Sequence, residues 1–590
     1  MSQLQPVTSA PPLAFARPAR ALRGSLGRNL LFGVAAVPLA LVALLLVVIV
    51  WLGLADDVHN GFLGPLTLRH YALLFSSPLV ARAIANTIGF SLVTVAVAMS
   101  IGLAAAWLVE RTNLPGKKAV YSTMTVGLLL PAFFQAMGWL FFLHPRIGML
   151  NQWLMRLFDL DSSPLNIASV FGMGWVEGLG LAPLAFVMTS PILRAMNPAF
   201  EDAALVHGLS RGATLRKVVL PLMWPGLIAA TIYILVIGTA TFEVPAIIGL
   251  GSKILTFSTL VYISVTPEMG VPNYGEVGAL SLPMILVSIL MSWCYFRVIR
   301  FADRYAVVQG RGYRPRLIDL GGWSWLGWGL FAVYFAIAIG LPLVMMAWAA
   351  FLPFFQPFSW HALSQLTLAN FRHIPLALIG RGAVNSLILM ISVPLAALFF
   401  GLAISWVVTR SRIRGRQYFD WIAFLPHAVP SVVFAISFLV LALFLLPSNF
   451  PLYGTILILM VVYVVVRLSF TTRVLNAALI QLHVELEEVA QVSGIPMLTA
   501  LRKIVLPLLA PAIVNLCLWN ALLTFRELTV AAFLVTQNNI TLPVVVWGIW
   551  QSGGLGPAAA SSLLFLAALV PVIVLYWIFG MRLLHDAGHP

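Results

Sequence analysis

The chain has 590 residues, of which 61% are hydrophobic and only 9% are charged, and its mean hydropathy is +0.99. These values exclude an ordinary soluble globular protein and place the chain in a lipid bilayer. The net charge is +15, but the basic residues are dispersed among short loops, which disfavours a nucleic-acid-binding surface.

The first 29 residues contain four arginines and no acidic residue, and we expect them to form a disordered cytoplasmic tail. A cleavable signal peptide is disfavoured because the apolar run from Leu30 is long enough to span a membrane. Further apolar runs follow, each near the roughly 20 residues that a helix needs to cross hydrocarbon. The twelve predicted spans lie near residues 30–54, 86–108, 120–143, 167–190, 222–248, 277–297, 325–351, 386–409, 421–446, 453–472, 508–534 and 558–580.

These spans predict an all-α polytopic membrane protein, because the apolar runs are continuous and do not alternate as barrel strands do. A polar, arginine-rich stretch separates six spans from six. With a cytoplasmic N-terminus, most of the 34 basic residues fall on cytoplasmic segments, so the positive-inside rule predicts that both termini are cytoplasmic. The predicted organisation is an N-terminal tail (1–29), a first half (30–300), a cytoplasmic linker (301–324), a second half (325–581) and a C-terminal tail (582–590).

The two halves are related by internal duplication. Residues 82–111 align with residues 381–410 at a constant separation of 299 residues. The separation then falls to 286, so the first half is 13 residues longer around residues 145–165. Parallel repeats of this kind imply a pseudo-twofold axis along the membrane normal, with a path for solute between the halves. The aligned pairs include Asn86 with Asn385, Thr87 with Ser386, Gly102 with Gly401 and Trp107 with Trp406.

The duplication is clearest in two acidic loops. Each loop has an acidic pair, then a glycine, and a Leu-Pro pair whose proline follows the glycine by 13 residues. The acidic segment predicts a short helix, and the glycine permits the positive φ that ends a helix. The proline then begins the next span. The two sets are Glu201, Asp202, Ala204, Gly208, Leu220 and Pro221, and Glu487, Glu488, Ala490, Gly494, Leu506 and Pro507.

This pattern resembles the cytoplasmic EAA loop of binding-protein-dependent ABC importer permeases, and two such loops resemble a fused double permease of the type I fold. The linker from Val308 to Arg316 is similar to a stretch common in ferric-iron-type members. The resemblance implies that each loop docks on an ATP-hydrolysing subunit and carries its motion to the spans. It also implies an inner-membrane location, two copies of that ATPase subunit, and a periplasmic or extracellular solute-binding protein.

The chain itself contains no motif for ATP binding or catalysis. Residues 249–253 only superficially resemble a phosphate loop, and we interpret them as a turn. We therefore expect a transport subunit that is not an enzyme and binds no cofactor, with ATP and magnesium on the partner subunit. We also expect no metal site, since Cys294 and Cys517 lie in separate spans and the His585–His589 pair lies on a polar tail.

Ionisable side chains inside apolar segments are candidates for a translocation pathway, because charge is unfavourable in hydrocarbon. Glu243 and Glu527 lie at similar distances after the Leu-Pro pairs, so we expect them to face each other across the pseudo-axis and to line an outer gate. The alternative is that they are interfacial or paired with Arg526. For His427, a hydrogen bond to backbone carbonyls freed by nearby prolines competes with a pore-facing role. The candidates are Glu177, Glu243, His427, Arg526 and Glu527.

For the solute, the resemblance ranks ferric iron first, followed by thiamine, a polyamine or a phosphonate. A different class, an ion-driven secondary transporter, would also show repeats and intramembrane carboxylates. It would have no need for two matching acidic loops. A membrane enzyme is disfavoured because no His, Asp or Ser cluster converges at one depth.

Overall fold

The computed structural model describes residues 19–58, 65–196, 199–267, 272–302, 317–411, 413–447, 451–576 and 578. Within these ranges the chain is helical, and only two isolated β-bridges occur, Ala55 with Leu66 and Thr112 with Ile318. The predicted all-α fold is therefore confirmed. The linker segment 308–316 that carried part of the family resemblance lies outside the described residues.

The first half begins earlier than predicted, because α1 is already helical from Ala19, within the stretch expected to be a disordered tail. Its helices are α1 (Ala19–Leu54), α2 (Arg69–Ser76), α3 (Pro78–Arg111), α4 (Lys117–Gly127), α5 (Ala132–Leu143), α6 (Met149–Phe158), α7 (Val170–Ala195), α8 (Ala199–Val206), α9 (Arg211–Thr214), α10 (Leu220–Ala240), α11 (Phe257–Val265) and α12 (Tyr274–Ala302).

The second half follows the same order without a counterpart of α6 between α19 and α20, but it contains additional short helices, so fourteen α-helices are described here against twelve in the first half. Its helices are α13 (Ser324–Phe335), α14 (Leu341–Phe351), α15 (Trp360–Ser364), α16 (Ala369–Arg372), α17 (Leu376–Arg410), α18 (Arg416–Ala428), α19 (Ser431–Val440), α20 (Ile456–Gln481), α21 (Glu485–Val492), α22 (Met497–Ala500), α23 (Leu506–Phe525), α24 (Thr529–Leu534), α25 (Leu542–Gln551) and α26 (Leu555–Leu575).

Among the described residues, ten helices are long and apolar enough to cross a membrane, and three further pairs of helices meet at sharp bends. Two predicted spans are such pairs: α4 with α5, bent by 91°, and α18 with α19, bent by 100°. Pro131 and Pro430 lie at these bends, where a missing N–H interrupts the helix. The third pair, Pro245–Ser252 with α11 (74°), was not predicted.

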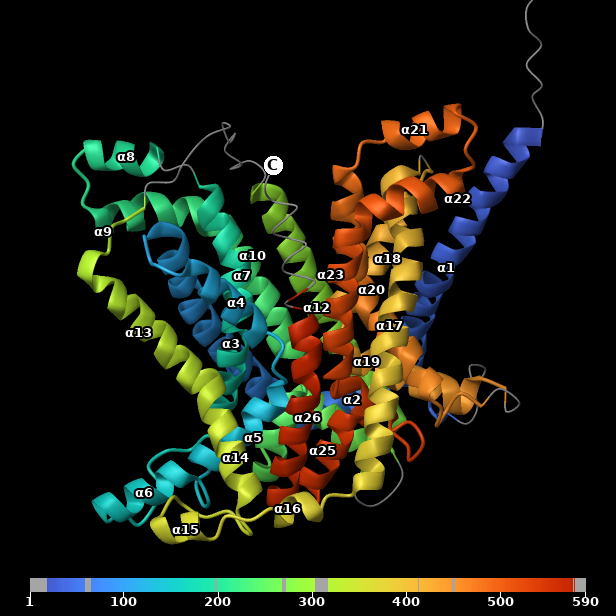
Figure 1. Cartoon of the computed structure of the whole chain (residues 1–590). Helices are drawn as coiled ribbons and strands as arrows, with labels where there is room; N and C mark the ends of the chain where they lie inside the picture. Colours follow the sequence, from blue (N-terminus) through green and yellow to red (C-terminus); the bar gives the residue numbers. More distant parts are fainter. Residues whose placement is uncertain are drawn as a thin grey trace, which may run out of the picture.

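The first span of each half packs against the other half (Figure 1). Helix α1 runs along α12 and also along α17, where Ala35 and Leu39 join a buried cluster with Ile404 and Val407. In the reciprocal exchange, α14 packs against α5, and the hydroxyl of Tyr334 in α13 donates a hydrogen bond to the Leu179 carbonyl at 3.0 Å. The two halves are thus intertwined and do not meet along a single flat interface.

Within each half, a long helix, α3 or α17, packs closely on the helix that precedes the acidic loop. A Cβ on Gly102 of α3 would lie 2.4 Å from the Cβ of Ala185 in α7. A Cβ on Gly401 of α17 would lie 2.5 Å from Cγ2 of Thr471 in α20. These duplicated glycines are therefore required by close helix packing, as small residues are in many membrane proteins.

The duplicated Asn-Thr and Asn-Ser pairs hold the short buried helices α11 and α25. The Asn86 amide donates to the Leu255 carbonyl at 2.8 Å, and the Thr87 hydroxyl accepts from the Phe257 N–H at 2.8 Å. In the second half, the Asn385 amide donates to the Ile540 carbonyl at 2.9 Å, while the Ser386 hydroxyl accepts from the N–H of Leu542, also at 2.9 Å. Each pair satisfies backbone groups at a helix start that would otherwise be unpaired in an apolar environment.

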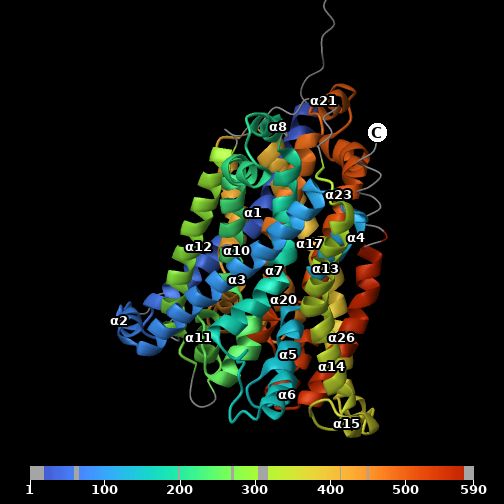
Figure 2. The same cartoon turned by 90° about the vertical axis from the view of Figure 1, so that its left-hand side faces the viewer.

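The short helices α8 and α9, together with α21 and α22, lie at one end of the molecule, and α6 and α15 lie at the opposite end (Figures 1 and 2). Helix α6 occupies the region where the first half is longer than the second. Its buried Asn151 donates to the carbonyls of Leu143 and Leu165 at 3.0 and 2.7 Å, which fixes this extra segment to the end of α5.

Candidate functional site: two acidic loops and a buried charge cluster

Both acidic loops fold as the sequence predicts. Helix α8 ends before Gly208, whose φ is +81°, and the Leu209 N–H donates to the Ala204 carbonyl at 3.0 Å. Helix α21 ends before Gly494, whose φ is +79°, and the Ile495 N–H donates to the Ala490 carbonyl at 2.9 Å. This is the Schellman geometry that favours glycine.

The remaining loop residues also have equivalent positions in the two copies. Ala204 and Ala490 are 6% and 3% exposed, so a larger side chain would not fit there without displacing its neighbours. The Leu-Pro pairs begin α10 and α23, each after a short π-helical segment, η2 (Leu215–Val219) or η9 (Leu501–Val505). Asp202 is half-buried, whereas Glu488 is exposed. The coupling role of these residues stays a prediction.

The first acid of each loop forms an ion pair with the last residue of a long helix. Arg111, at the end of α3, lies 3.0 Å from Glu201, and Arg410, at the end of α17, lies 2.9 Å from Glu487. Sequence reasoning missed both arginines as partners, although they close the aligned repeat 82–111 and 381–410. The available signal was an arginine at the same position in both halves.

The two loop helices also expose apolar side chains in register. Phe200 and Val206 of α8 are 42% and 86% exposed, and the equivalent Leu486 and Val492 of α21 are 43% and 90% exposed. These apolar side chains on a short helix at the end of a membrane protein are a candidate protein-binding surface.

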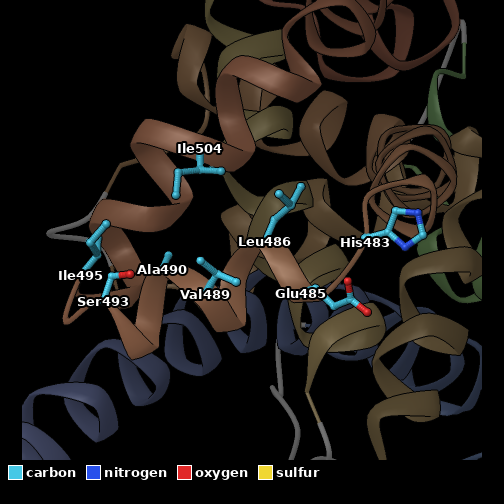
Figure 3. A pocket seen from close by; sticks show the side chains of 8 residues that line it. All are labelled: His483, Glu485, Leu486, Val489, Ala490, Ser493, Ile495 and Ile504. Carbon is cyan, nitrogen blue, oxygen red and sulfur yellow. The ribbon is translucent and has the colours of Figure 1, made fainter.

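A hollow of ≈ 610 Å³ opens beside α21. Figure 3 shows Leu486, Val489 and Ala490 on this helix and Ile504 of η9 across the hollow. Along this hollow, α21 is not packed against η9 by side chains of the described residues. The other lining residues are His483, Glu485, Ser493 and Ile495.

A buried charge cluster lies between the halves and includes four of the five predicted pathway residues. Glu177 of α7 is 5% exposed, and its carboxylate accepts a hydrogen bond from the Thr241 hydroxyl at 3.0 Å. Glu243 accepts from the backbone N–H of Phe133, in the first turn of α5, at 3.2 Å. Both acids thus belong to the first half, and Glu243 lies beside the α4–α5 bend.

The second half contributes the cations of this cluster. Arg526 crosses to the first half and donates to the Leu130 carbonyl, at the same α4–α5 bend, at 2.7 Å. Glu527 is paired with Arg467 of α20 at 2.6 Å. Arg526 also interacts electrostatically with Glu243 and Glu177, so the five side chains form one network.

Two expectations about this cluster need correction. The sequence predicts that Glu243 lies within one continuous span and that Arg526 and Glu527 lie within the equivalent span of the second half. In the structure, α10 ends at Ala240, before Glu243, and α23 ends at Phe525, before Arg526. The charged residues occupy the breaks that follow these helices, where exposed backbone groups and charges satisfy one another. Sequence reasoning also missed Arg467, whose signal was a lone basic residue inside the apolar run 453–472.

His427 belongs to a different cluster. Its ring stacks on Tyr233 of α10, with centroids 4.7 Å apart and planes 25° apart, and it also contacts Phe424. The expected hydrogen bond to backbone carbonyls near the prolines is thus replaced by ring stacking across the two halves. Nearby, Asp420 pairs with Arg473 at 3.2 Å.

Two further expectations can be compared with the structure. The segment that superficially resembles a phosphate loop is a short 3-10 turn, Leu250–Ser252, as interpreted from the sequence. Cys294 and Cys517 are both free cysteines. Among the described residues, no group of three or more His, Cys, Asp or Glu side chains is arranged to hold a metal ion.

A duplicated multi-span helical fold with two equivalent acidic loops at one end defines a membrane permease built from two related units. The chain belongs to the family described as the binding-protein-dependent transport system inner membrane component, which matches residues 98–307 and 395–585. It is a fused double permease of the importer type.

Similar proteins cover most of the chain. It is 24% identical to the ferric transport system permease protein FbpB of Actinobacillus pleuropneumoniae, over 85% of this chain and 72% of that protein. It is 25% identical to the Fe(3+)-transport system permease protein FbpB 2 of Haemophilus influenzae, over 81% and 86%. It is also 25% identical to the probable ABC transporter permease protein y4fN of Sinorhizobium fredii, over 79% and 81%.

Proposed function

We propose that this chain is the membrane-spanning subunit of an ATP-driven importer whose solute is ferric iron. The observation that carries the importer assignment is the pair of acidic helix–glycine–helix loops, which have the same geometry in both halves. The choice of iron rests on the names of similar proteins, several of which are ferric transport permeases. Thiamine, a polyamine and a phosphonate remain the competing solutes.

The two loop helices are the proposed docking sites for two copies of an ATPase subunit. Each presents an exposed apolar pair, Phe200 with Val206 or Leu486 with Val492, that a partner would cover. Two equivalent surfaces fit two equivalent partners. ATP and magnesium bind to those partners, and this chain supplies no cofactor or catalytic residue. The loops are cytoplasmic in this proposal, as are both termini, and the membrane is the inner membrane.

The proposed passage runs between the halves. A solute-binding protein docks at the opposite end, near α6 and α15, and delivers its solute toward the buried charge cluster. Closure of the ATPase subunits then moves the halves so that access alternates between the two ends. Glu177, Glu243, Arg526 and Glu527 shut or line the passage at that end, and His427 lies on its path nearer the loops.

The test is ATP hydrolysis by the chain purified with its ATPase and binding protein and reconstituted in nanodiscs. We expect stimulation by the iron-loaded binding protein and none by the empty one. Stimulation by a thiamine-, polyamine- or phosphonate-loaded protein alone would retain the importer and reject iron. Solute uptake driven by an ion gradient, without any associated ATPase, would establish a secondary transporter instead.

A further inference from the structure

The ion pairs between the loops and the long helices occur at equivalent positions in the two halves. Arg111 and Arg410 are 299 residues apart, whereas Glu201 and Glu487 are 286 apart. The pairing is therefore the same in both halves although the chain between arginine and glutamate differs in length. An incidental surface contact would have no reason to occur twice across this difference.

Both pairs are largely shielded from water. The side chains of Arg111 and Glu201 are 4% and 24% exposed, and those of Arg410 and Glu487 are 6% and 13% exposed. Solvent screens such pairs far less than exposed pairs, and removal of one partner leaves a charge that is poorly hydrated. Solvent therefore screens each pair less than it screens the Arg194–Glu110 pair, whose arginine is 63% exposed.

The position of each pair gives it a mechanical role. A short helix attached only at its two ends can rotate about its own axis, and a side-chain link from its first turn opposes that rotation. Arg410 links three elements, because it also donates to the carbonyls of Leu479 and Leu482, at the end of α20, at 2.9 and 2.8 Å. The hollow between α21 and Ile504 of η9 leaves part of the helix unpacked, and the ion pair links its first turn to α17 (Figure 3).

We propose that Arg111 and Arg410 are positioning residues that transmit the movement of each loop helix to the long helix α3 or α17. Force applied to α8 or α21 passes through the ion pair to a helix that packs along α7 or α20 and reaches the opposite end of the molecule. This inference rests on the proposed docking of ATPase subunits at the two loops.

The experiment uses the complete transporter in liposomes and measures solute uptake per ATP hydrolysed. The variants are Arg111→Met, Arg410→Met and both together. The matched control is Arg194→Met. It removes the ion pair of 3.0 Å between Arg194 and Glu110, the neighbour of Arg111 in sequence, and this pair links α3 to α7 instead of α8. We expect the double variant to hydrolyse ATP while its uptake per ATP falls on the order of tenfold or more, as expected when a shielded pair is broken. The control keeps the wild-type ratio.

A second set of variants separates transmission from general stability. The charge exchange Arg410→Glu with Glu487→Arg retains the ion pair with its polarity reversed but loses the donations to the Leu479 and Leu482 carbonyls, so we expect it to recover only part of the lost ratio. If the methionine variants fail to assemble, Arg410→Lys retains a positive charge at this position. We expect lysine to lower the uptake per ATP hydrolysed less than methionine does. A wild-type ratio in the double methionine variant would overturn the inference. Absence of solute-stimulated hydrolysis in the wild-type complex would reject the proposed function and, with it, this inference.

Discussion

Replacement of Arg526 by methionine tests whether the buried charge cluster holds the two halves together. Arg526 belongs to the second half, and its guanidinium donates to the Leu130 carbonyl of the first half. Methionine fills similar space but cannot donate a hydrogen bond or compensate Glu243. We expect the end of the molecule that carries α6 and α15 to open more readily in this variant.

The magnitude follows from the contact that is lost. A hydrogen bond to a charged group contributes about 1.5–3 kcal/mol. If this contact is present only while the halves are joined, its loss shifts the equilibrium between joined and separated states by about 10- to 150-fold, since about 1.4 kcal/mol corresponds to a factor of ten. The uncompensated carboxylates add to this effect, so the estimate is a lower bound.

The assay measures reaction of a buried cysteine with a membrane-impermeant thiol reagent added from the α6/α15 side. Ser562 of α26 suits this role, because its side chain is fully buried and its hydroxyl lies 3.7 Å from the sulfur of Met137 in α5. A Ser562→Cys substitution, made after both native cysteines are replaced by serine, introduces little steric change. The labelling rate then reports how often the halves separate.

The control is Arg467→Met, which removes the partner of Glu527 but disrupts a pair that lies wholly within the second half. Arg526→Met should increase the labelling rate by at least about tenfold relative to Arg467→Met. Equal labelling in two variants that are equally monodisperse in detergent would refute the idea that Arg526 joins the halves.

Four further predictions test individual features of the fold. Gly494→Val places a branched side chain at φ +79°, a strain of about 1–3 kcal/mol, and should reduce uptake per ATP hydrolysed while membrane insertion is unchanged. Gly401→Leu should lower the melting temperature in detergent, because overpacking destabilises by about 1–3 kcal/mol, whereas Gly548→Leu, in open space, should not. Asn385→Leu loses two hydrogen bonds to backbone carbonyls, about 1 kcal/mol each, and should speed proteolysis near α25. Burial and a nearby arginine lower the pKa of His144 in the folded protein. The unfolded chain therefore binds the proton more readily, and the free energy of unfolding should fall as the pH drops below about 6.5. The melting temperature of His144→Ala should lack this dependence on pH, and an identical dependence would contradict the prediction.

The sequence was sufficient for features that depend on local chemistry and periodic pattern. Apolar runs predicted the spans, and the acidic-pair and glycine spacing predicted the two loop helices and the glycines with positive φ. Internal alignment also identified Asn86 and Asn385 as equivalent, although it could not reveal what they bind. Their partners lie more than 150 residues away, and only the tertiary structure brings them together.

The sequence was insufficient where a polar residue sits in a break within an apolar segment. Hydropathy averages over about 19 residues, so the interruptions after Ala240 and Phe525 were absorbed into single predicted spans. The bend between α4 and α5 was missed for the same reason, although Pro131 marks it. Arg467 escaped notice because one cation does not prevent a 20-residue segment from being apolar, and its partner Glu527 lies far away in sequence, in the break between α23 and α24.

The charge cluster gives a physical reason for two unequal halves in one chain. Glu243 is the third residue after α10, whereas Arg526 and Glu527 directly follow α23, so the breaks after these two corresponding helices carry different charges. Glu243 accepts from an N–H on one side of the α4–α5 bend, and Arg526 donates to a carbonyl on the other side. Two identical subunits would carry the same residues in both breaks, so one break could not hold a lone acid while the other supplies the arginine. A duplicated chain can carry different charges in corresponding breaks, so one half can supply the arginine that compensates the acids of the other.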